Sequence, residues 1–346
     1  MKRKFVFGII LIGLLTLLGV LAACGGGGGG GGGGGEETSI PTSYDGATSQ
    51  ALITCENAEN VVKNSWEISS KQEVVEVAME VSGNLFDSYP DVPPQIYSDC
   101  GDLSYANVQL QVNQVSETYG TFEGQIDFVN YCVNWEESFD LNGLVTFSGT
   151  AQETSEGYVV TMILTFNNAQ KIVSDNLIYM ITERTVDLNV TLYNDLTVKE
   201  EITYKHVLLD ESTGKTYWFD DLATIILGEY ESKLVTATFS GRFYDHQYGF
   251  FDIESEGRLS IPDIDIPTGV LWFYGNGSEA RLIFDDGGTL LEVDQNSDGK
   301  MDCSFTDIFP TVAPALAPLS MSIDEPEQKE TMPGVEAEKI KRVFNF

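Results

Sequence analysis

The stretch YVVTMILTF, residues 158–166, decides the fold of this chain. Val160, Met162, Leu164 and Phe166 occupy every second position, so their side chains point to one face of an extended backbone. Period-two alternation in a segment rich in β-branched and aromatic residues predicts a strand with one buried face.

The same alternation runs from about residue 103 to residue 305. It is clear in residues 186–192, where Asp187, Asn189 and Thr191 separate the apolar positions. Turn signals interrupt it at hairpin intervals, which favours an antiparallel meander over βαβ units. The predicted fold is therefore mainly β: a curved sheet, a sandwich or an open barrel. The turn candidates are 153–157, 194–195, 211–214, 254–257, 275–277 and 285–288.

A weak internal sequence repeat, here called the glycine–phenylalanine echo, accompanies the meander. Gly124-x-x-x-Phe128 and Gly143-x-x-x-Phe147 are 19 residues apart, and Phe166 lies 19 residues beyond Phe147. Equal offsets return a residue to the same face of neighbouring strands, so we expect these phenylalanines to form a row in the core.

Residues 51–98 predict a helical segment in front of the sheet. Val77, Ala78, Val81 and Leu85 recur at helical spacing, and Val74 extends this apolar face. A weaker helical pattern covers residues 56–66, and prolines at 90, 93 and 94 end the segment. We expect these helices to cover one face or end of a β domain at 99–309.

Residues 1–23 have the layout of a bacterial lipoprotein signal peptide. Basic residues at positions 2–4 precede an apolar run, and the small residues Leu21-Ala22-Ala23 precede Cys24. Cys24 would become the first residue of the mature protein and carry diacylglycerol and palmitate. The sequence thus predicts a lipid-anchored protein of the cell envelope.

Flexible segments flank the predicted folded part. Eleven glycines follow Cys24, and residues 24–50 read as a tether that holds the domain away from the bilayer. Residues 310–346 are rich in proline and read as a disordered tail. Gly25 is not the aspartate that retains lipoproteins at the inner membrane of enteric-type bacteria, which favours the outer membrane if the cell is Gram-negative.

The charge balance excludes several partners. The chain has 53 Asp and Glu against 19 Lys and Arg, a formal net charge of −34. Such a surface repels nucleic-acid phosphate and anionic headgroups, so we expect contact with the membrane only through the lipid anchor. Cation binding and simple solubility both fit this composition.

The four other cysteines are disulfide candidates, because export places them in an oxidising compartment. Cys100 and Cys132 flank strand-like sequence at a modest separation, and Cys55–Cys303 then follows by exclusion. Reduced, buried thiols are the alternative for one or both pairs.

Calcium is the one cofactor that the sequence suggests. Asp294, Asn296, Asp298, Lys300 and Asp302 fall at positions 1, 3, 5, 7 and 9 of a calcium-loop pattern, with glycine at position 6. Position 12 is phenylalanine instead of the bidentate glutamate. A hairpin turn in which Asp and Asn bond their own backbone is the alternative.

A polar and aromatic strip is the second candidate site. Arg242, Tyr244, His246, Tyr248 and Phe250 alternate along a presumed strand. Such a strip could stack against sugars or short peptides, or it could be a sheet face that loops partly cover.

Catalytic patterns do not emerge from the sequence. The chain has only two histidines, His206 and His246, and no zinc-protease spacing. Ser212-Thr213-Gly214-Lys215 has the Ser-x-x-Lys spacing, but it lies between strand-like runs and reads as a turn. We therefore expect a protein that is not an enzyme.

Two longer stretches resemble uncharacterised exported bacterial lipoproteins. One runs from Gly120 through Cys132 to Gly149, and the other from Ser240 to Asp294. Their shared features are glycine, aromatic and turn residues. The resemblance implies a β-rich domain with Cys132 in a disulfide, and it implies no activity.

These observations predict a non-catalytic envelope lipoprotein. A binding or adhesion module that recognises a glycan or an envelope protein is the first hypothesis. A structural lipoprotein that acts through protein contacts is the alternative, and a hydrolase is disfavoured.

Overall fold

The computed structural model describes most of residues 41–308. Within this range it omits 42, 70–77, 79–80, 83, 87, 99–102, 117, 135–137, 167–169, 175–176, 195–196, 230–233, 262–267, 286–287 and 307. Cys24, the part of the predicted tether before residue 41 and the proline-rich tail lie outside the described residues, so the anchor stays a prediction. In the part of the chain that is described, no helix has the length and apolarity to cross a membrane.

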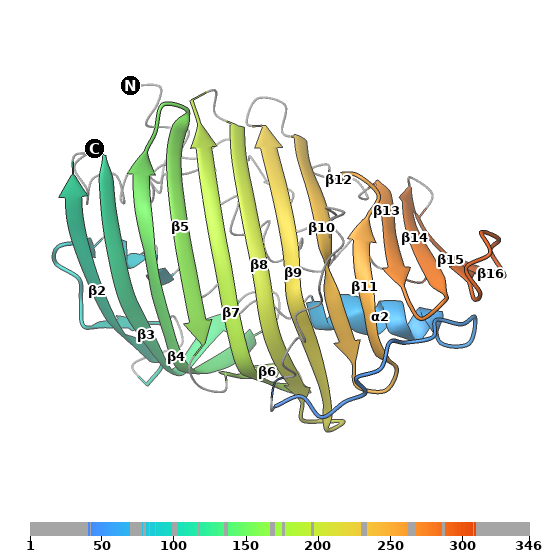
Figure 1. Cartoon of the computed structure of the whole chain (residues 1–346). Coiled ribbons are helices and arrows are strands. Elements are labelled where there is room, and N and C mark those ends of the chain that lie inside the picture. The colour runs from blue at the N-terminus through green and yellow to red at the C-terminus, as the bar shows by residue number, and fades with distance from the viewer. Residues whose placement is uncertain are drawn as a thin grey trace, which may run out of the picture.

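In the described part of the chain, sixteen strands form one sheet. Figure 1 shows its long strands lying side by side. Their bounds are β1 Gln95–Tyr97, β2 Tyr105–Ser116, β3 Tyr119–Asn134, β4 Ser138–Glu153, β5 Gly157–Phe166, β6 Gln170–Ser174, β7 Leu177–Tyr193, β8 Thr197–Asp210, β9 Lys215–Glu229, β10 Leu234–Asp245, β11 Gly249–Ser255, β12 Leu259–Ile261, β13 Gly269–Tyr274, β14 Glu279–Asp285, β15 Gly288–Asp294 and β16 Cys303–Thr306.

The sheet is an antiparallel meander, which confirms the predicted fold class. Strands follow one another in chain order from β1 to β16, except that β6 pairs only with β7 and β12 pairs with β10. No pairing joins the first and last described strands, so the sheet is open instead of closing into a barrel.

Helical residues cover one face of this sheet, here called the core face. Helix α2 (Ala58–Ser69) packs near β10 and buries Ala58, Val61 and Val62, as the predicted helical pattern implies. Further along, Ala78, Val81 and Leu85 are helical and at most 1% exposed. Val74 and Val77, the remaining members of the predicted apolar face, lie outside the described residues. The next residue of that segment, Phe86, meets the rings of Phe122 and Phe147 at centroid distances of 5.1 and 6.4 Å.

The glycine–phenylalanine echo has a different basis from the one expected. Phe128 and Phe147 are buried on the core face, but they do not face each other across strands. Instead, the antiparallel register sets Phe147 opposite Gly124 and Phe128 opposite Gly143. A side chain at Gly124 would collide with the Phe147 ring, since a Cβ there would lie 2.3 Å from it. Each phenylalanine thus packs over the glycine of the other segment, an arrangement that favours this register.

Bulges bend the long strands. The register shifts between β3 and β4, between β7 and β8, between β8 and β9, and between β9 and β10. Asn130 and Asp221, next to two of these shifts, have φ values of 46° and 50°, which non-glycine residues adopt rarely. Because an extra residue bends and twists its strand, these bulges curve the sheet.

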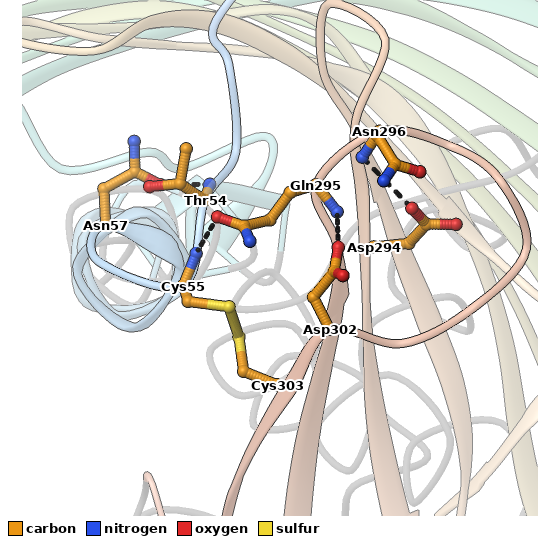
Figure 2. The surroundings of a disulfide bond; sticks show 8 residues. All are labelled: Thr54, Cys55, Asn57, Asp294, Gln295, Asn296, Asp302 and Cys303. Carbon is orange, nitrogen blue, oxygen red and sulfur yellow. Dashed lines mark hydrogen bonds between the residues drawn. A yellow bond between two sulfur atoms is a disulfide. The ribbon is translucent and has the colours of Figure 1, made fainter.

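A disulfide closes the C-terminal end of the fold. Cys55, just before α2, is bonded to Cys303 at the start of β16, which confirms this pairing (Figure 2). Cys132 is disulfide-bonded as well. Cys100 lies outside the described residues, so the Cys100–Cys132 pairing itself stays a prediction.

Candidate functional site

An open trough of about 1000 Å³ lies on the sheet face opposite the helices, here called the open face. It spans β2, β3, β4, β5, β7 and β8, whose side chains alternate between the two faces. Two rows of side chains cross these strands and line the trough. The first row is Gln111, Glu123, Ser148, Ile163, Asp187 and Thr203, and the second is Asn113, Thr121, Thr150, Thr161, Asn189 and Glu201.

The rows follow directly from strand register. In each row, consecutive residues are cross-strand partners, from Gln111 opposite Glu123 at one end to Asp187 opposite Thr203 at the other. Apolar residues fill the intervening core-face positions, such as Met162 and Leu188, which are 7% and 5% exposed. The alternation that predicts the strands therefore also builds the polar face.

Hydrogen bonds between neighbouring strands hold several trough side chains in place. The hydroxyl oxygens of Thr150 and Thr161 are 2.7 Å apart. The Asn189 amide donates to Glu201 at 3.1 Å, and the same carboxylate pairs with Lys199 at 2.6 Å. The trough thus presents hydroxyl, amide and carboxylate groups that are partly preorganised.

The charge of the trough is acidic. Glu123, Asp187 and Glu201 line it, and none of the lining residues is basic. Lys199 on the same strand as Glu201 is already engaged by that carboxylate. An anionic ligand would therefore be repelled, whereas a neutral or cationic one would not.

The strip at 242–250 is a hairpin, so the expectation of one continuous strand is wrong. β10 ends at Asp245, and His246, Gln247 and Tyr248 form a turn before β11. The Asp245 carboxylate accepts the backbone N–H groups of Gln247 and Tyr248 at 2.8 and 3.0 Å. An aspartate four residues before Gly249 is the sequence signal that could have revealed this turn.

The aromatic residues of the strip are used for packing. Tyr244 is 4% exposed and stacks on Trp218 at a centroid distance of 4.1 Å. The Arg242 guanidinium lies 4.2 Å from the Phe250 ring centroid and pairs with Asp252 at 2.7 Å, which raises the pKa of the arginine. Tyr244 is thus unavailable to a ligand, and its burial fits the alternative of a sheet face that other segments partly cover.

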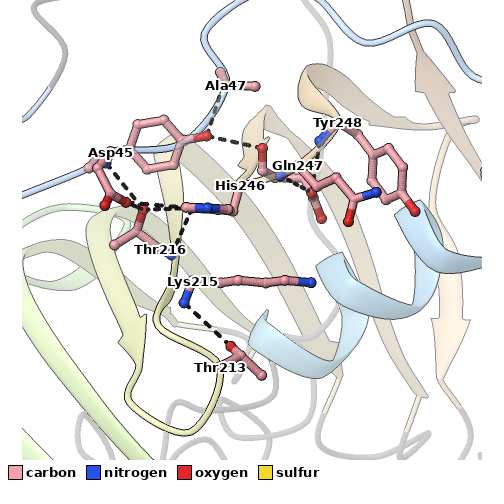
Figure 3. Close-up of polar contacts among 10 residues, drawn as sticks. Asp45, Ala47, Thr213, Lys215, Thr216, His246, Gln247 and Tyr248 are labelled. Atoms are coloured by element: carbon pink, nitrogen blue, oxygen red, sulfur yellow. Dashed lines mark hydrogen bonds and ion pairs between the residues drawn. The ribbon is translucent and has the colours of Figure 1, made fainter.

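The chain before α2 covers this aromatic cluster, which consists of Tyr44, Val207, Trp218, Tyr244 and Phe250. Figure 3 shows the polar contacts around it. The Tyr44 hydroxyl lies 2.9 Å from the Ala47 carbonyl and 3.0 Å from that of Asp245.

His246 belongs to the same contacts. Its Nδ1 accepts the Thr216 N–H at 3.2 Å and lies 3.5 Å from Asp45, as Figure 3 shows. Residues 43–50 are thereby fastened to the body where the predicted tether would enter it.

The predicted calcium loop is ordered by its own backbone. The Asp294 carboxylate is fully buried and accepts the N–H groups of Asn296, Asp298 and Gly299 at 3.1, 3.2 and 2.7 Å (Figure 2 shows the first). Burial raises the pKa of this carboxyl, but the hydrogen bonds outweigh it and the pKa is lowered.

The remaining oxygen side chains of the loop are engaged in the same way. Asn296 and Asp298 accept N–H groups of Asp298 and Lys300 at 3.0 and 2.9 Å, and Asp302 accepts that of Gln295. The described residues contain no group of three His, Cys, Asp or Glu that could hold a metal ion. This geometry matches the alternative, an Asx-rich turn, and calcium binding stays a prediction.

Two titratable groups are buried on the core face. Burial, followed by the nearby Arg184 charge, lowers the pKa of His206 well below its usual value. Burial likewise raises the pKa of Glu200 well above its usual value. His206 packs against the Phe219 ring at 4.9 Å. These groups lie on the face opposite the trough, so we assign them no part in it.

Ser212–Lys215 lies at the β8–β9 connection, as the sequence predicted. The Asp210 carboxylate accepts hydrogen bonds from both the backbone and the hydroxyl groups of Ser212 and Thr213. Ser212 is thus part of a capped turn instead of the start of a helix.

No protein family, curated protein or solved structure matches this chain at a significant level. The resemblance to exported lipoproteins therefore stays an expectation, and the trough is interpreted from its own chemistry.

Proposed function

We propose that this chain is a non-catalytic binding module of the bacterial cell envelope, held at a membrane by a lipid on Cys24, and that the trough binds a neutral glycan. The observation that carries the proposal is the pair of polar rows across β2–β8 on a face that the described helices leave open.

The chemistry of the rows supports a polyhydroxylated ligand. Threonine and serine hydroxyls and asparagine and glutamine amides both donate and accept hydrogen bonds, as sugar hydroxyls do. The three carboxylates accept from hydroxyl donors, and charged acceptors make the stronger hydrogen bonds. Ile163, which is 48% exposed in the first row, offers a small apolar contact for a sugar ring.

The charge of the trough and of the chain favours a neutral ligand over an acidic polysaccharide. Glu123, Asp187 and Glu201 would repel uronate, sulfate or phosphate groups, and the net charge of −34 adds to that repulsion. The length of the trough, across six strands, suits a chain of several sugar units more than a single one.

The structural role through protein contacts is the alternative. It is favoured by the uncharged edge of the sheet at β2. The two roles are compatible, because the edge uses backbone groups of β2, whereas the trough uses side chains of β2 and the strands that follow it.

A titration of the purified full chain with neutral oligosaccharides tests the proposal. Cello-, malto- and xylo-oligosaccharides serve as probes, and oligogalacturonate serves as the anionic comparison. Thr150→Val with Thr161→Val removes two hydroxyls at nearly constant volume. Two lost hydrogen bonds of about 1 kcal/mol each would weaken binding roughly 30-fold.

Thr238→Val is the matched control, because Thr238 lies on β10 outside the trough. We expect it to bind like the unmodified chain. Equal weakening by Thr238→Val, or binding of oligogalacturonate alone, would refute the assignment of the trough to neutral glycans.

A further inference from the structure

The first long strand, β2, is an open edge over most of its length. β1 pairs only with Tyr105, Ala106 and Asn107, and the Pro94 carbonyl accepts the Val108 N–H at 3.1 Å. From residue 109 to residue 116, no described residue pairs with the side of β2 that faces away from β3.

The direction of the free backbone groups follows from these contacts. Ser104 and Val108 bond outward, to Ser98 and Pro94, and backbone groups alternate sides along a strand. The N–H and C=O groups of Leu110, Val112 and Gln114 therefore also point outward. They form a row of donors and acceptors that another strand could complete.

Apart from a register shift between Gln114 and Ser116, the edge lacks the features that usually prevent such pairing. β2 has no charged residue and no proline in twelve positions, although charged residues make up 21% of the chain. Among the described strands of ten or more residues, only β5 is also uncharged, and it is paired on both sides. The opposite edge, β16, has four residues and follows Asp302 directly.

Exposed apolar side chains lie at both ends of the same edge. Six large hydrophobic side chains of the described residues are exposed, and three of them belong to β1, β2 or the loop between them. Tyr97 is 55% exposed, Leu103 84% and Val115 58%. They add exposed apolar area to the two ends of this edge.

We propose that β2 is a dimerisation edge, at which a second copy of this chain adds its own β2 in antiparallel orientation. Centring the pairing on Val112 sets Leu110 opposite Gln114 of the second copy and Gln111 opposite Asn113 of the second copy. Each outward-facing pair exchanges two backbone hydrogen bonds.

The sequence of β2 fits a copy of itself. Its amide side chains at 109, 111, 113 and 114 both donate and accept, so they are complementary to one another across a two-fold axis. An uncharged strand also meets no like charge when it pairs with itself. Gln111 and Asn113 begin the two trough rows, so the dimer joins two troughs across the axis.

The net charge gives the dimer a distinctive salt dependence. Two chains of net charge −34 repel each other, and salt screens this repulsion over about 10 Å at 0.1 M. The dimer therefore tightens as salt is added, whereas a complex with a cationic partner would weaken.

Sedimentation equilibrium of the full chain over a range of protein and salt concentrations tests the proposal. We expect a mass that rises from one chain to two, and dimerisation that strengthens with salt. Gln109→Lys with Val115→Lys places lysines opposite each other and should weaken the dimer roughly tenfold. Gln109→Glu with Val115→Glu should do the same.

Mixing the lysine and glutamate variants separates interface effects from misfolding. The mixture should form a heterodimer although each variant alone is largely monomeric. Ile225→Lys is the matched control, since Ile225 is 37% exposed on β9, a strand paired on both sides, and this variant should still dimerise.

Three results would overturn the proposal. They are a monomer at every concentration and salt level, a dimer that the edge substitutions leave unchanged, and charge variants that mixing fails to restore. None of these substituted residues lines the trough, so failure here is distinguishable from failure of glycan binding.

Discussion

Single residues divide this protein into two faces with different chemistry. On the core face, His206 and Glu200 are each 1% exposed among apolar neighbours. On the open face, Ser148 and Asp187 are exposed to solvent. Sequence alternation identified the strands, but it did not show that a buried histidine and a buried glutamate occupy the apolar face. In a period-two pattern, polar residues such as His206 and Glu200 predict positions that face solvent.

His206 should make the fold sensitive to mild acid. Its folded-state pKa is lowered, so the unfolded chain takes up the proton first as the pH falls below about 6.5. The stability contributed by the neutral form is complete above that pH and declines below it, by at most about 1.4 kcal/mol per pH unit. His206→Phe should flatten this part of the profile. Urea unfolding at a series of pH values measures the free energy of unfolding of both chains across this range.

The control for this experiment is His246→Gln, which removes the other histidine. His246 lies in the turn between β10 and β11. We expect the His246 variant to keep the acid-induced decline. Parallel profiles for the unmodified chain and His206→Phe would contradict this account of His206.

At the scale of elements, the hairpin meander and the N-terminal helices were predictable because their signals are local. The trough was not, because it depends on which residues of six strands fall into register. Between β3 and β4 that register depends on the bulge next to Asn130, which lies between the β3–β4 turn and the trough residues and leaves little trace in hydrophobic periodicity. The hairpin at Asp245–Gly249 was missed for a different reason, since aromatic alternation masked an aspartate-capped turn.

The Cys55–Cys303 disulfide should contribute much of the stability of the last strands. It joins residues 248 positions apart and ties β16, a four-residue edge strand, to the start of α2. Cys55→Ser with Cys303→Ser should therefore reduce the free energy of unfolding by about 2–5 kcal/mol. Urea unfolding of the double variant checks this value.

Substitution is preferable to a reductant here, because Cys132 is also disulfide-bonded and would be reduced at the same time. An unchanged unfolding midpoint in the double variant would show that the backbone pairing of β15 and β16 suffices without the covalent bond.

At the scale of the whole molecule, the structure is an open curved sheet with one face packed against helices and a polar trough on the other. The sequence predicted the sheet and offered the sandwich, the open barrel and the curved sheet as alternatives. Local patterns could not choose among them, because closure depends on whether the first and last strands meet. The first and last described strands do not pair with each other, and the open sheet leaves both the trough and the β2 edge accessible.

The predicted lipid anchor would attach the trough and the β2 edge to a membrane surface. A tether that enters the body at residues 43–50 would hold the sheet away from the bilayer while keeping it among other anchored copies of the chain. The aromatic cluster under Tyr44 fixes the point of entry.

Hydrogen exchange of the full chain, with and without a neutral oligosaccharide that it binds, tests the central claim most directly. The account predicts slower exchange in the strands that line the trough, above all β4, β5 and β7, and no change at the hairpin of residues 245–249. Protection confined to that hairpin or to the 294–302 loop, with the trough strands unchanged, would contradict it.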